Sequence, residues 1–210
     1  MPEITSVIDP ERTGESSDLM RLLTNYSEIL IKLFSPQILA VATLLFLFFL
    51  VSVLPHMADR LVAVTGTKLS PDTAFVYSVT ELYAMAEAYG QEGRAYYIRQ
   101  RFTFDLIWPA VYFLFFSTLT TFISRKFSLG SVWRRINILP AGAVCFDLLE
   151  NITVSLLFYR YPLPLTSVAL IAPVSTMFKW LIIGLIVVAV FSATLILIRS
   201  KNSWQYKSNC

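Results

Sequence analysis

Histidine and cysteine are scarce in this chain. Its 210 residues include one histidine, His56, and two cysteines, Cys145 and Cys210. This scarcity excludes His-rich zinc sites and bis-histidine haem sites, and the lack of a Cys-x-x-Cys pair excludes thioredoxin-like redox chemistry. We therefore expect no haem, iron–sulfur cluster or His/Cys zinc site, and the identity of any other cofactor stays open. Glycine-rich phosphate loops and a Gly-x-Ser-x-Gly turn are also absent from the sequence.

Charged residues are scarce as well, at 15% of the chain. Soluble globular domains carry about 25% charged residues. Hydrophobic residues instead make up 56% of the sequence, and the mean hydropathy is +0.63. The formal net charge of +3 comes mostly from cations that flank apolar runs, so it gives no reason to expect nucleic acid as a partner.

Long apolar runs dominate what the sequence does contain. Each approaches the ~20 residues that a helix needs to cross a hydrocarbon core of ~30 Å. Helices satisfy their own backbone polar groups in such a setting, so we predict an all-α membrane protein built as a four-helix transmembrane bundle. The predicted spans are 36–54, 102–123, 137–158 and 173–198.

The remaining segments define the predicted domain organisation. Residues 1–17 are polar and without periodicity, which predicts a disordered tail, and residues 200–210 form a C-terminal tail. Leucines at helical spacing over 18–35 predict an amphipathic helix that lies along the membrane surface or packs on the bundle or a partner. The transmembrane domain is 36–199, with a partly helical outer loop over 56–100. In that loop Ser70-Pro71-Asp72 predicts the start of a helix that runs to Tyr89 and stops at Gly90.

Basic residues predict the orientation of the bundle. Four cations crowd the short loop between the second and third spans, and three follow the fourth span. The positive-inside rule places both groups on the cytoplasmic side of a cell or cytoplasmic membrane, so both termini are cytoplasmic and the 56–100 loop lies outside. Five cations in or near that loop argue weakly against this orientation. The group in the short loop is Arg125, Lys126, Arg134 and Arg135. The group after the fourth span is Arg199, Lys201 and Lys207.

Ionisable residues inside the spans are the main functional signal. Asp147, Glu150 and Asn151 lie three and four residues apart in the third span, so they share one helix face. A carboxylate in hydrocarbon is costly, and intramembrane ionisable residues mark functional sites by default.

Two other spans carry polar residues at a similar depth. On the second span and the segment that leads into it, Tyr97, Arg101, Asp105, Trp108 and Tyr112 form one stripe, although the aromatic residues Tyr97 and Trp108 also fit an interfacial aromatic belt. In the fourth span Ser175 and Lys179 are one turn apart. Since consecutive spans alternate in direction, these groups belong to one leaflet. The candidate catalytic residues are Asp147, Glu150, Lys179 and Asp105, and the candidate ligand-binding residues are Asn151, Tyr112, Arg101 and Ser175.

This cluster holds more negative than positive groups, so it requires a shared proton, a bound cation or an arginine from the loop. Three functions fit it. The first is an enzyme or binder that acts on a lipid or isoprenoid-type substrate by acid–base chemistry. The second is a subunit of a proton- or cation-coupled transporter. The third is a non-catalytic scaffold whose polar cluster only fixes helix register. The expected partners are membrane lipid and, for the latter two, a homo-oligomer or another membrane protein.

Overall fold

The computed structural model describes residues 10–127 and 135–208, and every regular element within these ranges is helical. The elements are α1 (Pro10–Leu33), α2 (Pro36–Phe48), the π-helical turn η1 (Phe49–Val53), α3 (Leu54–Thr65), the 3₁₀ turn η2 (Pro71–Thr73), α4 (Val79–Ala88), α5 (Gly90–Arg101), α6 (Phe104–Phe127), the 3₁₀ turn η3 (Arg135–Ile138), α8 (Leu139–Arg160) and α9 (Thr166–Ser208).

Four helices in the described ranges are long and apolar enough to cross a membrane, which agrees with the predicted number. They are Pro36–Thr65, Gly90–Arg125, Ile136–Arg160 and Thr166–Ile196. All four extend beyond the predicted spans at one end or both, and the longer first two reduce the predicted 56–100 loop to residues 66–89. Hydropathy marks only the lipid-compatible part of a helix, and polar residues such as Asp59 extend the helix beyond that part without ending it. The first helix ends at Gly66, whose φ of 70° lies in the left-handed region that glycine favours.

Helical structure also extends into both predicted tails. α1 begins at Pro10, so residues 10–17 are helical where we predict disorder, and residues 1–9 lie outside the described ranges. α9 likewise continues to Ser208 through most of the predicted 200–210 tail. Adding a residue to an existing helix costs little compared with starting one, so polar residues can continue a neighbouring helix, here even past Gly14.

The helix predicted from Ser70 to Tyr89 forms only in its second half. Pro71–Thr73 is a single 3₁₀ turn, and α4 starts after Ser78 instead. Ser78 and Glu81 form a reciprocal capping box, a stronger helix start than the proline at residue 71. The predicted stop is confirmed at Gly90, whose φ of 62° separates α4 from α5.

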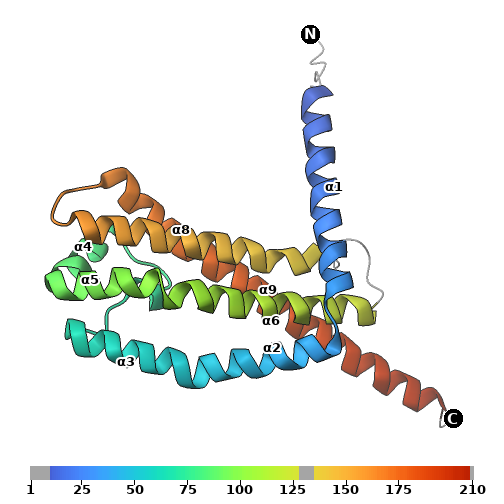
Figure 1. The fold of residues 1–210 in the computed structure, drawn as a ribbon. Coiled ribbons are helices and arrows are strands. Elements are labelled where there is room, and N and C mark those ends of the chain that lie inside the picture. The colour runs from blue at the N-terminus through green and yellow to red at the C-terminus, as the bar shows by residue number, and fades with distance from the viewer. Residues whose placement is uncertain (1–9, 128–134, 209–210) are drawn as a thin grey trace, which may run out of the picture.

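The helices of membrane length run alongside one another, and α1 stands across their direction at one end (Figure 1). α8 and α9 form the most extensive helix pair among the described residues. Two apolar cores fill the bundle. One includes Leu82, Tyr97, Leu157 and Ala172, and the other includes Tyr112, Ala143 and Ile186.

A band between these cores holds the charged residues. On α5–α6 it falls between Tyr97 and Tyr112, and on α8 between Ala143 and Val154. On α9 it falls between Ala172 and Ile186. The two cores therefore close off the polar residues from both ends of the bundle.

Candidate functional site

The predicted polar face of α8 points into the bundle. Asp147, Glu150 and Asn151 are all buried, and Glu150 has no exposed surface. Their spacing of three and four residues places them on one side of the helix, and that side faces α9 and α6.

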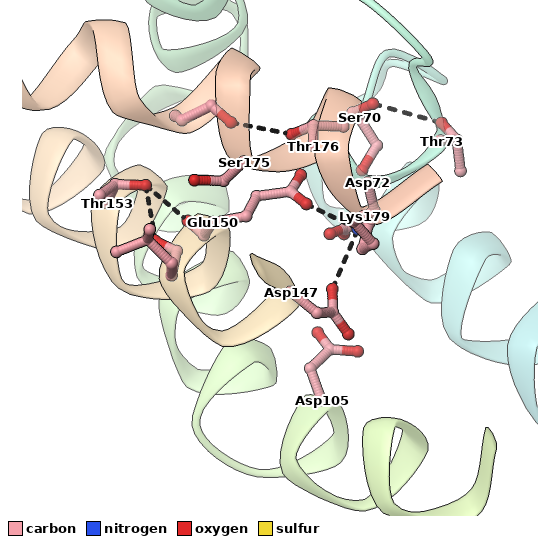
Figure 2. Close-up of polar contacts among 12 residues, drawn as sticks. Ser70, Asp72, Thr73, Asp105, Asp147, Glu150, Thr153, Ser175, Thr176 and Lys179 are labelled. Atoms are coloured by element: carbon pink, nitrogen blue, oxygen red, sulfur yellow. Dashed lines mark hydrogen bonds and ion pairs between the residues drawn. The ribbon is translucent and has the colours of Figure 1, made fainter. Parts of the chain in front are cut away.

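Lys179 on α9 binds both carboxylates of that face. Its Nζ lies 3.0 Å from Asp147 Oδ1 and 2.6 Å from Glu150 Oε2, and both contacts are drawn in Figure 2. The lysine side chain is itself buried, so it does not extend to the membrane surface. A single ammonium group therefore holds two carboxylates that lie one helical turn apart.

Tyr112 on α6 completes the contacts of Asp147. Its hydroxyl donates to Asp147 Oδ2 over 3.1 Å, so both oxygens of this carboxylate are hydrogen-bonded. Glu150 differs, because its Oε1 is buried and has no hydrogen-bond partner within the described chain. Glu150 thus retains a buried acceptor for another group.

A second ion-pair group adjoins the first. Arg101 Nη1 lies 2.7 Å from Asp105 Oδ2 and also pairs with Asp72 from the 66–89 connection. The guanidinium carbon lies 4.4 Å from the centre of the Tyr97 ring, and Tyr97 is completely buried. Tyr97 is therefore not a member of an aromatic belt at the membrane surface, which corrects that interpretation of the sequence.

The two groups form one centre. Figure 2 shows the carboxyl groups of Asp105 and Asp147 turned toward each other, and the two carboxylates are close enough to interact electrostatically. We refer to the combined set as the polar centre. Its members are Asp72, Arg101, Asp105, Tyr112, Asp147, Glu150 and Lys179.

Negative groups outnumber positive ones in the polar centre. Four carboxyl groups, from Asp72, Asp105, Asp147 and Glu150, share the charges of Arg101 and Lys179. Arg94, which lies on α5 and not in the loop, does not supply a third cation. It donates to Ala86 O and stacks on Tyr161. Buried excess charge is costly, so the centre is balanced only when it takes up a proton or a cationic group.

Two predicted site residues do not join these ion pairs. Ser175 is buried, but its hydroxyl donates to Ile171 O within α9 over 2.8 Å. Neither polar atom of the buried Asn151 has a hydrogen-bond partner within the described chain, and the hydroxyl of Ser155, one turn further along α8, has none. Buried polar groups without partners are rare, so this face of α8 retains hydrogen-bonding capacity for a polar ligand.

The connection between α3 and α4 also contributes to the polar centre, which the residue spacing did not predict. Asp72 reaches Arg101, and the hydroxyl of Tyr77 lies 3.0 Å from Thr176 Oγ1. Burial, followed by the charge of Glu150, raises the pKa of Tyr77 above its ordinary value, so its hydroxyl stays protonated. The sequence signal for this contribution was Asp72, a carboxylate flanked along the chain by apolar Leu69, Phe75 and Val76. The adjacent Pro71 instead indicated the start of a helix.

No group of three or more histidine, cysteine or acidic side chains able to hold a metal ion occurs within residues 10–127 and 135–208. No protein-family model, curated protein or solved structure matches this chain.

Proposed function

We propose that the chain is a multi-pass integral membrane protein whose four long helices cross a cell or cytoplasmic membrane with both termini on the cytoplasmic side. The apolar surface of the bundle supports insertion. Large hydrophobic side chains are exposed along the outward faces of α2, η1 and α9, among them Leu44, Val51 and Phe191. Soluble proteins rarely expose contiguous apolar surface on this scale. The basic residues after the second and fourth spans support the orientation.

The N-terminal helix suits the cytoplasmic surface of that membrane. Four apolar residues at helical spacing, Leu22, Tyr26, Ile29 and Leu33, form an exposed stripe on α1. The neighbouring face, with buried Ser27 and Leu30, packs on the bundle. Because α1 stands across the spans (Figure 1), it lies in the plane of the membrane when they cross it, and its stripe enters the lipid interface.

For the polar centre we propose acid–base chemistry on a lipid or isoprenoid-type substrate. In this function Glu150 exchanges a proton with the substrate, because its Oε1 is buried and has no hydrogen-bond partner within the described residues. Asp147 fixes Lys179 from one side, and Lys179 stabilises negative charge that develops beside Glu150. Asn151 offers a donor and an acceptor to the polar part of the substrate.

One observation carries this proposal. Four carboxyl groups share two cations at the band between two apolar cores; Asp105, Asp147 and Glu150 are buried, and the side chain of Asp72 is 20% exposed. A cluster that only fixed helix register would be expected to balance its charges, because excess charge there weakens the bundle. The imbalance suits a site that binds and releases a proton during its work.

The experiment compares Glu150→Gln with the unsubstituted protein. Glutamine keeps the size and most of the hydrogen bonding of the glutamate but removes its titratable group. After purification in mild detergent, the protein is mixed with a total extract of membrane lipids, and native mass spectrometry measures the lipids it retains. We expect Glu150→Gln to retain at least tenfold less of the specifically bound lipid while keeping its helical content.

Glu87→Gln is the matched control, because Glu87 is exposed on α4 and outside the polar centre. It should retain lipid as the unsubstituted protein does. Equal retention by Glu150→Gln and Glu87→Gln would contradict the proposal.

A second function, proton- or cation-coupled transport as a subunit of an oligomer, is favoured by the arrangement of the carboxylates. They run from fully buried Glu150 through Asp147 and Asp105 to Asp72, whose side chain is 20% exposed. Such a row can pass a proton between a buried site and the surface. Proton uptake into protein-containing vesicles under an imposed potential, abolished by Asp105→Asn, would favour this function over lipid chemistry.

A further inference from the structure

Residues 69–77, which lie beside the polar centre in the connection between α3 and α4, expose large apolar side chains and bury two polar ones. Their largest apolar residues point outward. Leu69 is 58% exposed, Phe75 is 65% exposed and Val76 is 74% exposed. Two of the polar residues, Ser70 and Tyr77, are buried, whereas Asp72 is half-buried and Thr73 is exposed. The cluster of exposed large apolar side chains fits an apolar environment on the outer side of residues 69–77.

Polar contacts fasten this segment to the helices beneath it. Asp72 pairs with Arg101 at the end of α5, and Tyr77 contacts Thr176 on α9. At its start, the hydroxyl of Tyr89 donates to Leu69 O over 2.7 Å. Burial raises the pKa of Tyr89 to about 12, so this donor is present at neutral pH. In Figure 2 Asp72 lies beside Lys179, so the segment covers one side of the polar centre.

The segment also lies deep in the bundle. The ring of Phe75 stacks on Trp180 of α9, with the ring centres 5.0 Å apart. Trp180 lies about 20 Å from the first residue of α9, at 1.5 Å per helical residue. The apolar part of α9 has 31 residues and is therefore about 46 Å long. A hydrocarbon core of ~30 Å centred on it leaves about 8 Å at each end, so Phe75 lies at the depth of the hydrocarbon.

We infer that residues 69–77 form a lipid-facing gate, and that the polar centre exchanges its ligand sideways with the acyl-chain region of the bilayer. The occupant of the outer face of the gate is lipid hydrocarbon, because the exposed side chains there are apolar and at hydrocarbon depth. The ligand class that follows is an amphiphile whose polar head enters the centre while its chain stays beside Phe75 and Val76. The identity of this ligand rests on the proposed function, but the placement of the gate in lipid does not.

The test places a spin label on the gate. Val76→Cys is made in a Cys145→Ser/Cys210→Ser background, labelled with a nitroxide and reconstituted in phosphatidylcholine vesicles. Collision with oxygen, which concentrates in lipid, is compared with collision with a water-soluble nickel complex. Glu87→Cys is the control on exposed α4. We expect the Val76 label to collide at least fivefold more with oxygen relative to nickel than the Glu87 label does.

Each other outcome overturns the inference. A Val76 label as accessible to nickel as the control would place the gate in water. Spin–spin broadening at Val76 under conditions where the control shows none would mean that a second copy of the chain covers this face.

The outcome is also distinguishable from failure of the proposed function. A lipid-exposed Val76 together with full lipid retention by Glu150→Gln would support the lipid-facing gate and contradict the proposed acid–base chemistry. A water-exposed Val76 together with lost retention would contradict the gate and support the chemistry.

Discussion

At the scale of single residues, Lys179 is the group on which the polar centre depends for cohesion. It is the buried cation that contacts both Asp147 and Glu150. Replacing it with methionine preserves the length and apolar stem of the side chain but leaves two carboxylates without their cation. We expect Lys179→Met to lower the free energy of unfolding by about 3 kcal/mol, the order of the cost of breaking a buried ion pair. Unfolding by heat in detergent measures the change.

Lys68→Met provides the control, because Lys68 is exposed on the connection between α3 and α4. It should unfold as the unsubstituted protein does. If Lys179→Met unfolds at the same temperature as this control, the lysine contributes nothing to the stability of the bundle, which would contradict the prediction. A large loss of stability in Lys179→Met, combined with unchanged lipid retention in Glu150→Gln, would instead favour a purely structural centre.

Helical spacing alone was enough to predict much of the polar centre. Residues three and four apart on one helix share a face whatever the fold, which is why the grouping on α8 and the stripe from Arg101 to Tyr112 point inward as predicted. Asp72 could not be predicted in this way, because a non-local loop brings it to Arg101. Ser175 was placed on the correct face, but a helical serine can satisfy its hydroxyl on the preceding turn, as this one does.

At the scale of elements, α4 depends on its capping box. The backbone N–H and the hydroxyl of Ser78 both donate hydrogen bonds to Glu81. These bonds, the backbone one having the larger effect, lower the pKa of Glu81 below its ordinary value. A lowered folded-state pKa contributes stability that is present above the ordinary value of 4.5 and is lost as the pH falls through the lowered pKa. We expect the first turn of α4 to lose hydrogen-exchange protection only in this acidic range, after correction for intrinsic exchange rates.

Glu81→Gln should remove this pH dependence, because glutamine does not titrate. Ser78→Ala should weaken the start of the helix at all pH values by about 1 kcal/mol, the usual cost of losing a capping hydroxyl. Protection that falls equally with pH in the unsubstituted protein and in Glu81→Gln would contradict the assignment.

The attachment of α1 depends on a buried asparagine. The side-chain amide of Asn137 donates to Ser27 O over 3.2 Å and to Thr121 Oγ1 over 3.3 Å, and thereby joins α1 to α6. Asn137→Leu leaves these acceptors without this donor, at a cost of about 2 kcal/mol. We expect faster proteolytic cleavage within α1, measured by limited proteolysis in detergent, whereas Asn25→Leu on the exposed surface of α1 should not change the rate. Equal cleavage rates would show that α1 is held by other contacts.

Helix boundaries were harder to predict than helix number. The apolar runs fixed where four helices lie, because the lipid-compatible part of each is set by hydropathy. They did not fix where the helices end, since α3, α5 and α9 continue through polar residues that hydropathy treats as loop or tail. Capping signals occur near both Ser70 and Ser78. Only the reciprocal pair of Ser78 and Glu81 starts an α-helix, whereas Ser70 precedes a single 3₁₀ turn.

At the scale of the whole molecule, the proposed orientation decides which side of the membrane the polar centre and its gate serve. α3, α5, α8 and α9 each have an end at the same side as the 66–89 connection, and the end of α6 that carries Arg125 lies at the opposite side. Because the basic side is retained in the cytoplasm, we expect the gate to open toward the outer leaflet.

Single-cysteine labelling tests this orientation in intact cells, using the Cys145→Ser/Cys210→Ser background. Gln91→Cys lies at the start of α5, on an exposed position, and should react with a membrane-impermeant maleimide added from outside. Ser128→Cys, in the basic loop, should react only after the membrane is permeabilised. If the reverse pattern is found, the five cations in and near the first loop outweigh the seven that favour the cytoplasmic assignment, and the gate faces the inner leaflet. The polar residues of α6, α8 and α9 would still lie at a similar depth after such a reversal, because this placement depends only on the alternation of helix direction.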